Sequence, residues 1–145
     1  MTPNAYNLLL AALALAVLTF VVSLLMLYSR VQEMRAKRLH PQKAATSKLM
    51  AANLENVQAA DNFRNLFETP VLFYALVACA LAASFVPPWL VIGAWCYVAL
   101  RVVHSIIHCT YNNVMHRLAV FAMSFVLLLG LWIAFVVTLP NRVLL

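Results

Sequence analysis

The chain has 145 residues, of which 66% are hydrophobic and 10% are charged, and its formal net charge is +6. Soluble globular chains contain roughly half apolar residues, so this composition excludes an ordinary soluble domain. It indicates a single domain whose solvent is mostly lipid. The positive charge does not indicate a nucleic-acid partner, because the basic residues beside the first hydrophobic span have no aromatic residues between them for base stacking.

The first hydrophobic span covers residues 6–28 and contains no charged residue. A helix of about 20 residues crosses the hydrocarbon core of a bilayer, so this span predicts a transmembrane helix. No Lys or Arg precedes it, and it is longer than the ~7–15-residue apolar part of a signal peptide. We therefore expect it to remain in the mature protein. Residues 29–62 are predicted to form a cytosolic connection, with Pro41 ending any extension of the first helix.

Three further spans are predicted, over residues 63–85, 90–110 and 118–139. The second helix is expected to begin near Ser47, to enter the membrane at Phe63, and to kink at Pro70, because a proline ring removes a backbone donor and clashes one turn back. The sequence thus predicts an all-α membrane protein in which residues 1–145 form one four-transmembrane-helix bundle.

The loops differ strongly in charge. Six of the ten Lys and Arg residues fall between Arg30 and Lys48, and Arg117 follows the third span, whereas the connection between spans two and three has no charge. The positive-inside rule therefore places the basic loops in the cytosol and both termini on the non-cytosolic side. A basic loop of this kind can also contact anionic lipid.

Two groups of polar residues fall at membrane depth, where each ionisable group costs a few kcal/mol and therefore needs a partner or a purpose. The first group is spaced i, i+3, i+4, i+7, which predicts one polar stripe on the second helix: Asp61, Arg64, Asn65 and Glu68. The second group predicts a similar stripe on the third helix: Tyr97, Arg101, His104, His108, Tyr111 and Asn112.

These stripes have two main interpretations. One is structural: Glu68 and Arg101 form a buried ion pair that fixes the register of the helices. The other is functional, because the three arginines at this depth, Arg64, Arg101 and Arg117, outnumber the carboxylates. Surplus cationic donors beside a cytosolic opening suit an anionic ligand.

A third interpretation is metal or haem ligation by His104 and His108. Their i, i+4 spacing places both imidazoles on one face of a helix. However, His116 falls outside that arc, and the nearby arginines would repel a cation. We therefore expect no metal site.

Two stretches of the sequence resemble the membrane-associated proteins in eicosanoid and glutathione metabolism, the MAPEG family. Residues 64–73, Arg-Asn-Leu-Phe-Glu-Thr-Pro-Val-Leu-Phe, are similar to the family's segment that enters its second helix. Arg101-x-x-His104, followed sixteen residues after Arg101 by Arg117, is similar to the family's third-helix motif and its catalytic arginine. In hydropathy the resemblance spans essentially the whole chain.

The resemblance implies a homotrimer with each site between helices of adjacent protomers. It implies glutathione as a co-substrate and a transferase or peroxidase that acts on lipophilic electrophiles, with Arg117 as the catalytic residue facing the sulfur. It implies a divergent, bacterial-like member, in a bacterial inner membrane rather than the endoplasmic reticulum. The residues expected to bind glutathione are Arg64, Asn65, Glu68, Arg101, His104, His108 and Tyr111.

The sequence departs from the family pattern at two positions. Asp61 stands where an arginine is expected, and His108 stands where a tyrosine is expected, with Tyr111 one turn further on. Both changes keep a second function class open, a non-enzymatic lipid-binding or adaptor membrane protein on the same scaffold. Retention of Arg117 favours the enzyme.

Overall fold

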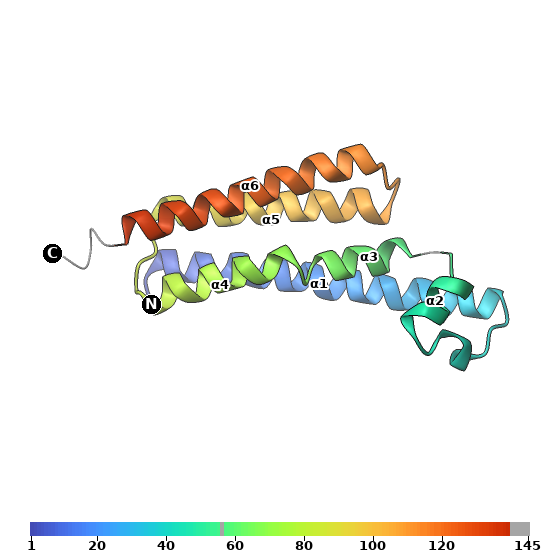
Figure 1. The fold of residues 1–145 in the computed structure, drawn as a ribbon. Coiled ribbons are helices and arrows are strands. Elements are labelled where there is room, and N and C mark those ends of the chain that lie inside the picture. Colours follow the sequence, from blue (N-terminus) through green and yellow to red (C-terminus); the bar gives the residue numbers. More distant parts are fainter. Residues whose placement is uncertain (56, 140–145) are drawn as a thin grey trace.

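The computed structural model describes residues 1–55 and 57–139, and all the regular structure within them is helical. The elements are α1 (Pro3–Ala36), η1 (Pro41–Ala44), α2 (Ser47–Asn53), α3 (Gln58–Asn65), α4 (Thr69–Ala82), α5 (Pro88–Cys109) and α6 (Val114–Thr138). This architecture confirms the predicted all-α fold (Figure 1). Residues 140–145 of the expected domain lie outside the described residues.

Four stretches of the described chain are long and apolar enough to cross a membrane: Pro3–Ala36, Gln58–Ala82, Pro88–Cys109 and Val114–Thr138. Large apolar side chains such as Phe20, Leu24 and Val126 are mostly exposed on the outside of the bundle. A soluble protein rarely exposes so much contiguous apolar surface, whereas lipid tails solvate it readily. The chain is therefore an integral, multi-pass membrane protein.

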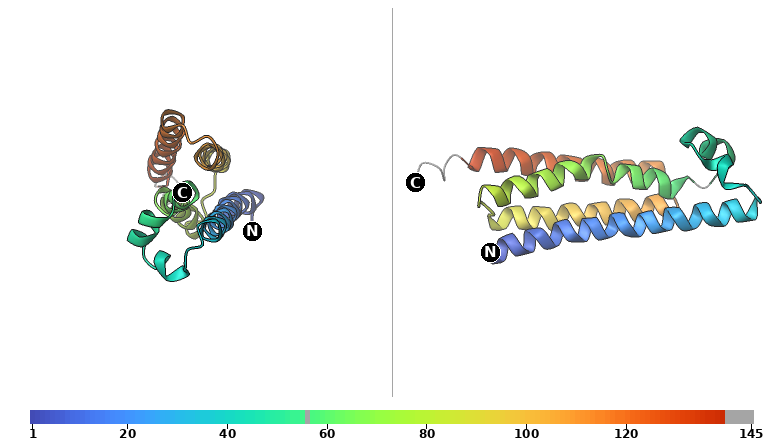
Figure 2. Two further views of the ribbon diagram at one scale, coloured as in Figure 1. Left: turned by 90° about the vertical axis from the view of Figure 1, so that its right-hand side faces the viewer. Right: turned by 90° about the horizontal axis from the view of Figure 1, so that it is seen from below.

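The long helices run side by side along one axis (Figures 1 and 2). Helix α5 packs against α6 and α1, and α1 also packs against α3 and α4. The core between them is apolar and includes Leu15, Phe73, Leu76 and Tyr97, with the rings of Phe73 and Tyr97 stacked at 4.9 Å. Tyr97 and Leu76 are almost completely buried, so this core fixes how α4 and α5 face each other.

Helix α1 ends earlier than Pro41. It stops at Ala36, Arg38 takes a left-handed backbone conformation with φ 48°, and the Leu39 amide donates to the Met34 carbonyl at 2.9 Å. This is a common way to end a helix, since it satisfies one of the free terminal carbonyls. Pro41 instead begins the short η1 turn.

The second span is interrupted, so the expectation of one continuous, kinked helix was wrong. Helix α3 ends at Asn65 and α4 begins at Thr69, while α2 is a separate short helix. Pro70 occupies the first turn of α4, a position where the missing N–H costs nothing because that donor has no partner within the helix. The proline therefore starts a new helix instead of bending an existing one.

The two glycines of the chain differ in their surroundings. A Cβ added at Gly93 in α5 would clash with the Leu131 side chain of α6, whereas a Cβ at Gly130 would meet no atom within 4 Å. We expect Gly93→Ala to lower the free energy of unfolding by about 1–3 kcal/mol through overpacking. The melting temperature in detergent would fall accordingly.

The matched control for this prediction is Gly130→Ala, which should leave the melting temperature unchanged or raise it slightly, because alanine is the better helix former. Equal effects of the two substitutions would show that the contact between Gly93 and Leu131 does not limit the packing of α5 on α6.

Candidate functional site

A cavity of about 210 Å³ lies near the basic end of the bundle, between the end of α3, the C-terminal part of α5 and the start of α6. Its lining residues are Asn65, His104, Val114, Arg117, Leu118 and Phe121. Three of the residues singled out from the sequence, Asn65, His104 and Arg117, thus come from three different helices to one cavity.

Arg101 is completely buried and is not among the residues that line this cavity. One of its guanidinium nitrogens, Nη2, donates to the Asn65 carbonyl at 3.1 Å, and its Cζ lies 5.6 Å from the centroid of the Phe121 ring. The other two nitrogens, Nε and Nη1, have no hydrogen-bond partner in the structure. Arg101 therefore contacts two residues that line the cavity and has unused donors.

The ion pair between Glu68 and Arg101, one of the two interpretations of the stripes, does not form. Glu68 is exposed, and the ion pairs of the described residues are Lys37–Glu33, Lys37–Glu55 and Arg64–Asp61. Arg101 is thus a buried cation without a carboxylate in contact, which is costly in a protein interior unless something else compensates the charge.

Two buried histidines on α5 contact Arg117, and one of them, His104, lines the cavity. His104 Nδ1 lies 3.2 Å from the Arg117 carbonyl, and because a carbonyl can only accept, this ring nitrogen must donate. His104 Nε2 is buried without a partner. His108 Nε2 lies 3.2 Å from Arg117 Nη1, which can only donate, so that nitrogen of His108 accepts.

Arg117 projects from the first turn of α6, the helix that Asn113 caps by accepting from the amides of Met115 and His116. The guanidinium donates through Nη1 to Asn112 Oδ1 at 2.9 Å as well as to His108. Both partners are neutral acceptors when His108 is uncharged. Among residues 1–55 and 57–139, no carboxylate lies within ion-pair distance of Arg117 to cancel its charge.

The remaining candidates do not reach the cavity of their own chain. Arg64 and Asp61 approach each other only to 4.0 Å, with 72% and 50% of their side chains exposed. Glu68 is also exposed, and Tyr111 is 60% exposed with its hydroxyl 3.3 Å from His116 Nδ1. The single stripe predicted for the second helix was wrong, because the helix breaks after Asn65 and Glu68 belongs to the turn before α4.

Asn62 was missed, although it is the polar residue that α3 buries completely. Its Nδ2 donates to Cys109 Sγ at 3.3 Å, and its Oδ1 accepts from Ser105 Oγ at 3.3 Å. Ser105 and Cys109 are spaced i, i+4 on α5, and Asn62 precedes Asn65 by three residues. These spacings could have identified the contact between the two helices. Asn62 holds α3 against α5 and so helps to position the Asn65 carbonyl that Arg101 binds.

We expect Asn62→Ala to lower the free energy of unfolding by about 1–3 kcal/mol, because it leaves Ser105 and Cys109 without their buried partner. Thermal unfolding in detergent would measure the loss. Asn7→Ala is the matched control, since Asn7 is exposed on α1. A melting temperature that falls equally in both variants would contradict a special role for Asn62.

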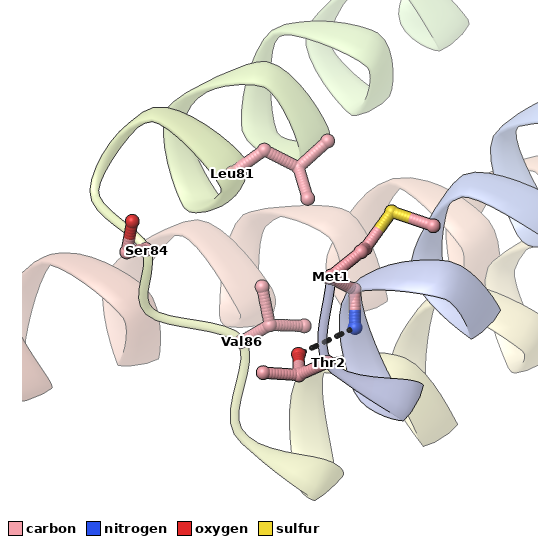
Figure 3. Close-up of a pocket in the computed structure, with 6 residues that line it drawn as sticks. Met1, Thr2, Leu81, Ser84 and Val86 are labelled. Carbon is pink, nitrogen blue, oxygen red and sulfur yellow. Dashed lines mark hydrogen bonds between the residues drawn. The ribbon is translucent and has the colours of Figure 1, made fainter.

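Other hollows in the described chain differ from this cavity. A hollow of about 470 Å³ at the opposite end of the bundle is lined by no Lys, Arg, Asp or Glu side chain (Figure 3). Its lining residues are Met1, Thr2, Ala5, Leu81, Ser84 and Val86. A mostly apolar groove of about 350 Å³ lies between α1 and the α3–α4 break.

Within residues 1–55 and 57–139, no group of three His, Cys, Asp or Glu residues could hold a metal ion.

The four apolar spans and the cationic cavity at one end of them define an integral membrane protein with a polar site inside its helical bundle. The model of the MAPEG family matches residues 8–137 of the chain. The chain therefore belongs to the MAPEG family, which confirms the resemblance found in the sequence. A search of curated proteins and a search of solved structures each gave no match.

Proposed function

We propose that this protein is a glutathione-dependent transferase or peroxidase that acts on lipophilic electrophiles in the membrane. The observation that carries the proposal is Arg101, a buried guanidinium with two unused nitrogens that contacts Asn65 and Phe121. Both of these residues line the cavity to which Arg117 also belongs. A carboxylate matches the fork of a guanidinium and compensates its charge. Because Phe121 lies over Arg101 and lines the cavity, its ring would have to shift for a ligand carboxylate to reach these donors.

Arg117 is proposed to face the sulfur of glutathione. A free thiol has a pKa of about 8.5, and the thiolate is the nucleophile. Lowering that pKa by about 2 units requires roughly 2.7 kcal/mol of preferential stabilisation of the anion. One guanidinium in a partly dry site can supply this. The partners of Arg117 support the proposal, because Asn112 and an uncharged His108 position the guanidinium without cancelling its charge.

Two reactions then need no nucleophile from the protein. In conjugation, the thiolate attacks an electrophilic carbon, a sulfur–carbon bond forms, and the leaving group departs with its electron pair. In peroxide reduction, the thiolate attacks the terminal peroxide oxygen, a sulfur–oxygen bond forms and the oxygen–oxygen bond breaks. The products are a sulfenic acid and an alkoxide, which takes a proton from water to give the alcohol. A second glutathione converts the sulfenic acid to a disulfide and water. In both, Arg117 stabilises the reacting anion.

A homotrimer is proposed to complete the site. Arg64 and Glu68 carry charge on the outer surface near one end of the apolar spans, where exposure to lipid is unfavourable. A second copy packed on this surface would cover both side chains and add them to a site shared between protomers. In that arrangement Arg64 binds a ligand carboxylate and Glu68 accepts from the ligand ammonium. Native mass spectrometry in detergent should give the mass of three chains.

The lipophilic substrate class is supported by the groove between α1 and the α3–α4 break. Phe20, Phe67 and Val71 line it, and all three are more than half exposed on the outside of the bundle. An apolar molecule dissolved in the bilayer can therefore contact this groove without crossing water.

The direct test is to assay the purified protein in detergent with glutathione and a hydrophobic aryl halide, and separately with a lipophilic hydroperoxide. We expect product formation above the uncatalysed rate with at least one of them, saturating in glutathione. No acceleration with either substrate would refute the proposed activity.

The alternative is a lipid-binding or adaptor protein without a reaction. The size of the cavity, about 210 Å³, favours it, because ligand sites usually measure about 300–1,000 Å³. A ligand that binds only the native state must raise its melting temperature. A shift with millimolar glutathione favours the enzyme, and no shift favours the adaptor.

A further inference from the structure

The basic end of the chain carries a folded extension, residues 35–55, which we name the basic cap. Helix α1 has 34 residues and is therefore about 50 Å long, some 20 Å more than a hydrocarbon core of ~30 Å. Figure 1 shows η1 and α2 beyond the ends of α3, α5 and α6. In the left view of Figure 2, along the bundle, they lie beside the four long helices rather than over them. The basic cap therefore lies to one side of the bundle axis, where the lipid that surrounds the membrane-spanning helices has its headgroups.

Lys37 fastens the basic cap to α1. Its ammonium contacts Glu33 and Glu55 at 2.8 Å each, and it donates to the Asn53 carbonyl at 3.2 Å. The Glu55 amide also donates to Glu33 at 2.6 Å. The hydrogen bonds that Lys37 donates, first to Glu33 and then to Glu55, raise the pKa of Lys37 above its ordinary value of 10.5, so Lys37 stays charged at neutral pH. Glu33 and Glu55 thus both form an ion pair with Lys37.

The other cations of the basic cap have no such partner. Lys37 is the one Lys or Arg among residues 29–55 that lies within ion-pair distance of a carboxylate in the described chain. The exposed cations that remain are Arg35, Arg38, Lys43 and Lys48. Leu49, 41% exposed, adds an apolar side chain next to Lys48. Basic and apolar side chains together suit the interface between lipid headgroups and acyl chains.

A second copy of the chain offers little negative charge to this surface. The whole sequence has four Asp and Glu residues. Glu33 and Glu55 contact Lys37, and Asp61 lies 4.0 Å from Arg64. The fourth, Glu68, is exposed and is a single charge. The membrane that the chain spans, by contrast, can present many phosphates to an overhanging segment.

We propose that the basic cap binds the headgroups of anionic phospholipids in the membrane that the protein spans. The clamp at Lys37 holds the segment in place, and Lys43 and Lys48 on its exposed side contact lipid phosphates. The inference does not depend on the proposed enzymatic function, since neither glutathione nor the cavity takes part in it.

The experiment reconstitutes the full chain into membranes and compares the motional restriction of spin-labelled phosphatidylglycerol with that of spin-labelled phosphatidylcholine. We expect the protein to select phosphatidylglycerol. Replacing both residues, Lys43→Gln and Lys48→Gln, should lower that selectivity by up to about fivefold for each cation that contacts a headgroup. Salt at ~1 M should also lower it, because the screening length falls to about 3 Å.

The matched control is the pair Lys43→Arg and Lys48→Arg, which keeps both charges and should keep the selectivity. Both pairs change exposed side chains, and circular dichroism checks that each variant retains its helix content. Equal selectivity in the glutamine variant and the native chain would overturn the proposal. A change of oligomeric mass in the glutamine variant, without lipid selectivity in the native chain, would also overturn it and would assign the surface to contacts between copies.

Discussion

Replacing Arg101 with methionine is expected to stabilise the ligand-free protein and to abolish its stabilisation by glutathione. Arg101 is completely buried, has two unpartnered nitrogens and contacts no carboxylate. An arginine within a membrane span costs about 2.5–3.5 kcal/mol on insertion scales, and methionine fills a similar volume without charge. Part of this gain is offset by loss of the hydrogen bond to Asn65 and the contact with Phe121. Melting temperatures in detergent, with and without millimolar glutathione, measure both effects.

The change in melting temperature of the ligand-free Arg101→Met variant distinguishes a binding residue from a structural one, because the two roles predict changes of opposite sign. If Arg101 serves only to join α5 to α3, the methionine variant should be less stable under both conditions. Arg30→Met is the matched control, because it makes the same substitution at the basic end of α1, away from the cavity. It should keep the glutathione shift of the native chain. A destabilised Arg101→Met protein that still responds to glutathione would contradict the proposed role.

Arg117→Ala is expected to slow the glutathione-dependent reaction about 100-fold at neutral pH, which corresponds to roughly 2.7 kcal/mol of lost thiolate stabilisation. The direction in which the rate changes with pH also follows from the stabilisation of the thiolate by Arg117. With Arg117 present the bound thiol is ionised below its free pKa, so the rate is already high at neutral pH. Without it the rate should rise with pH until the thiol ionises near its free pKa of about 8.5. Initial rates between pH 6 and pH 9 test this.

Two further variants separate the charge of Arg117 from its position. Arg117→Lys keeps the charge and should retain part of the rate. Asn112→Ala removes the 2.9 Å hydrogen bond that orients the guanidinium but leaves the charge, so the pH profile should keep its native shape while the rate falls less than in Arg117→Ala. Equal rates for the native chain and Arg117→Ala would remove Arg117 from the mechanism.

Much of the fold follows from hydropathy alone. Four long, predominantly apolar stretches are best solvated by lipid, so an all-α membrane bundle was predictable. The break between α3 and α4 was not, because Pro70 is compatible either with a kinked helix or with the first turn of a new one. In the structure the Asn65 carbonyl at the end of α3 accepts from the Arg101 side chain of α5, a contact that compensates for a helical hydrogen bond lost at the break. A contact between residues 36 positions apart is not visible in local sequence.

The candidate site was predictable in part. The helical spacing of Tyr97, Arg101, His104 and His108 correctly places them on the buried side of α5. The same reasoning failed for α3, since periodicity shows that polar residues share a face but not what that face contacts. On α3 the predicted polar stripe included Asp61, which is exposed, and omitted the neighbouring Asn62, which makes the buried contacts. Tyr111 follows the end of α5, so helical periodicity no longer applies to it.

The most direct test of the proposed site is a structure of the protein with glutathione in a lipid nanodisc. We expect a ligand carboxylate about 2.7–2.9 Å from the nitrogens of Arg101 that lack a partner in the ligand-free chain, and the sulfur beside the Arg117 guanidinium. Saturating glutathione that leaves the cavity empty, or that binds elsewhere while Arg101 keeps its unpartnered nitrogens, would contradict the proposal that these cations form an anion-binding site.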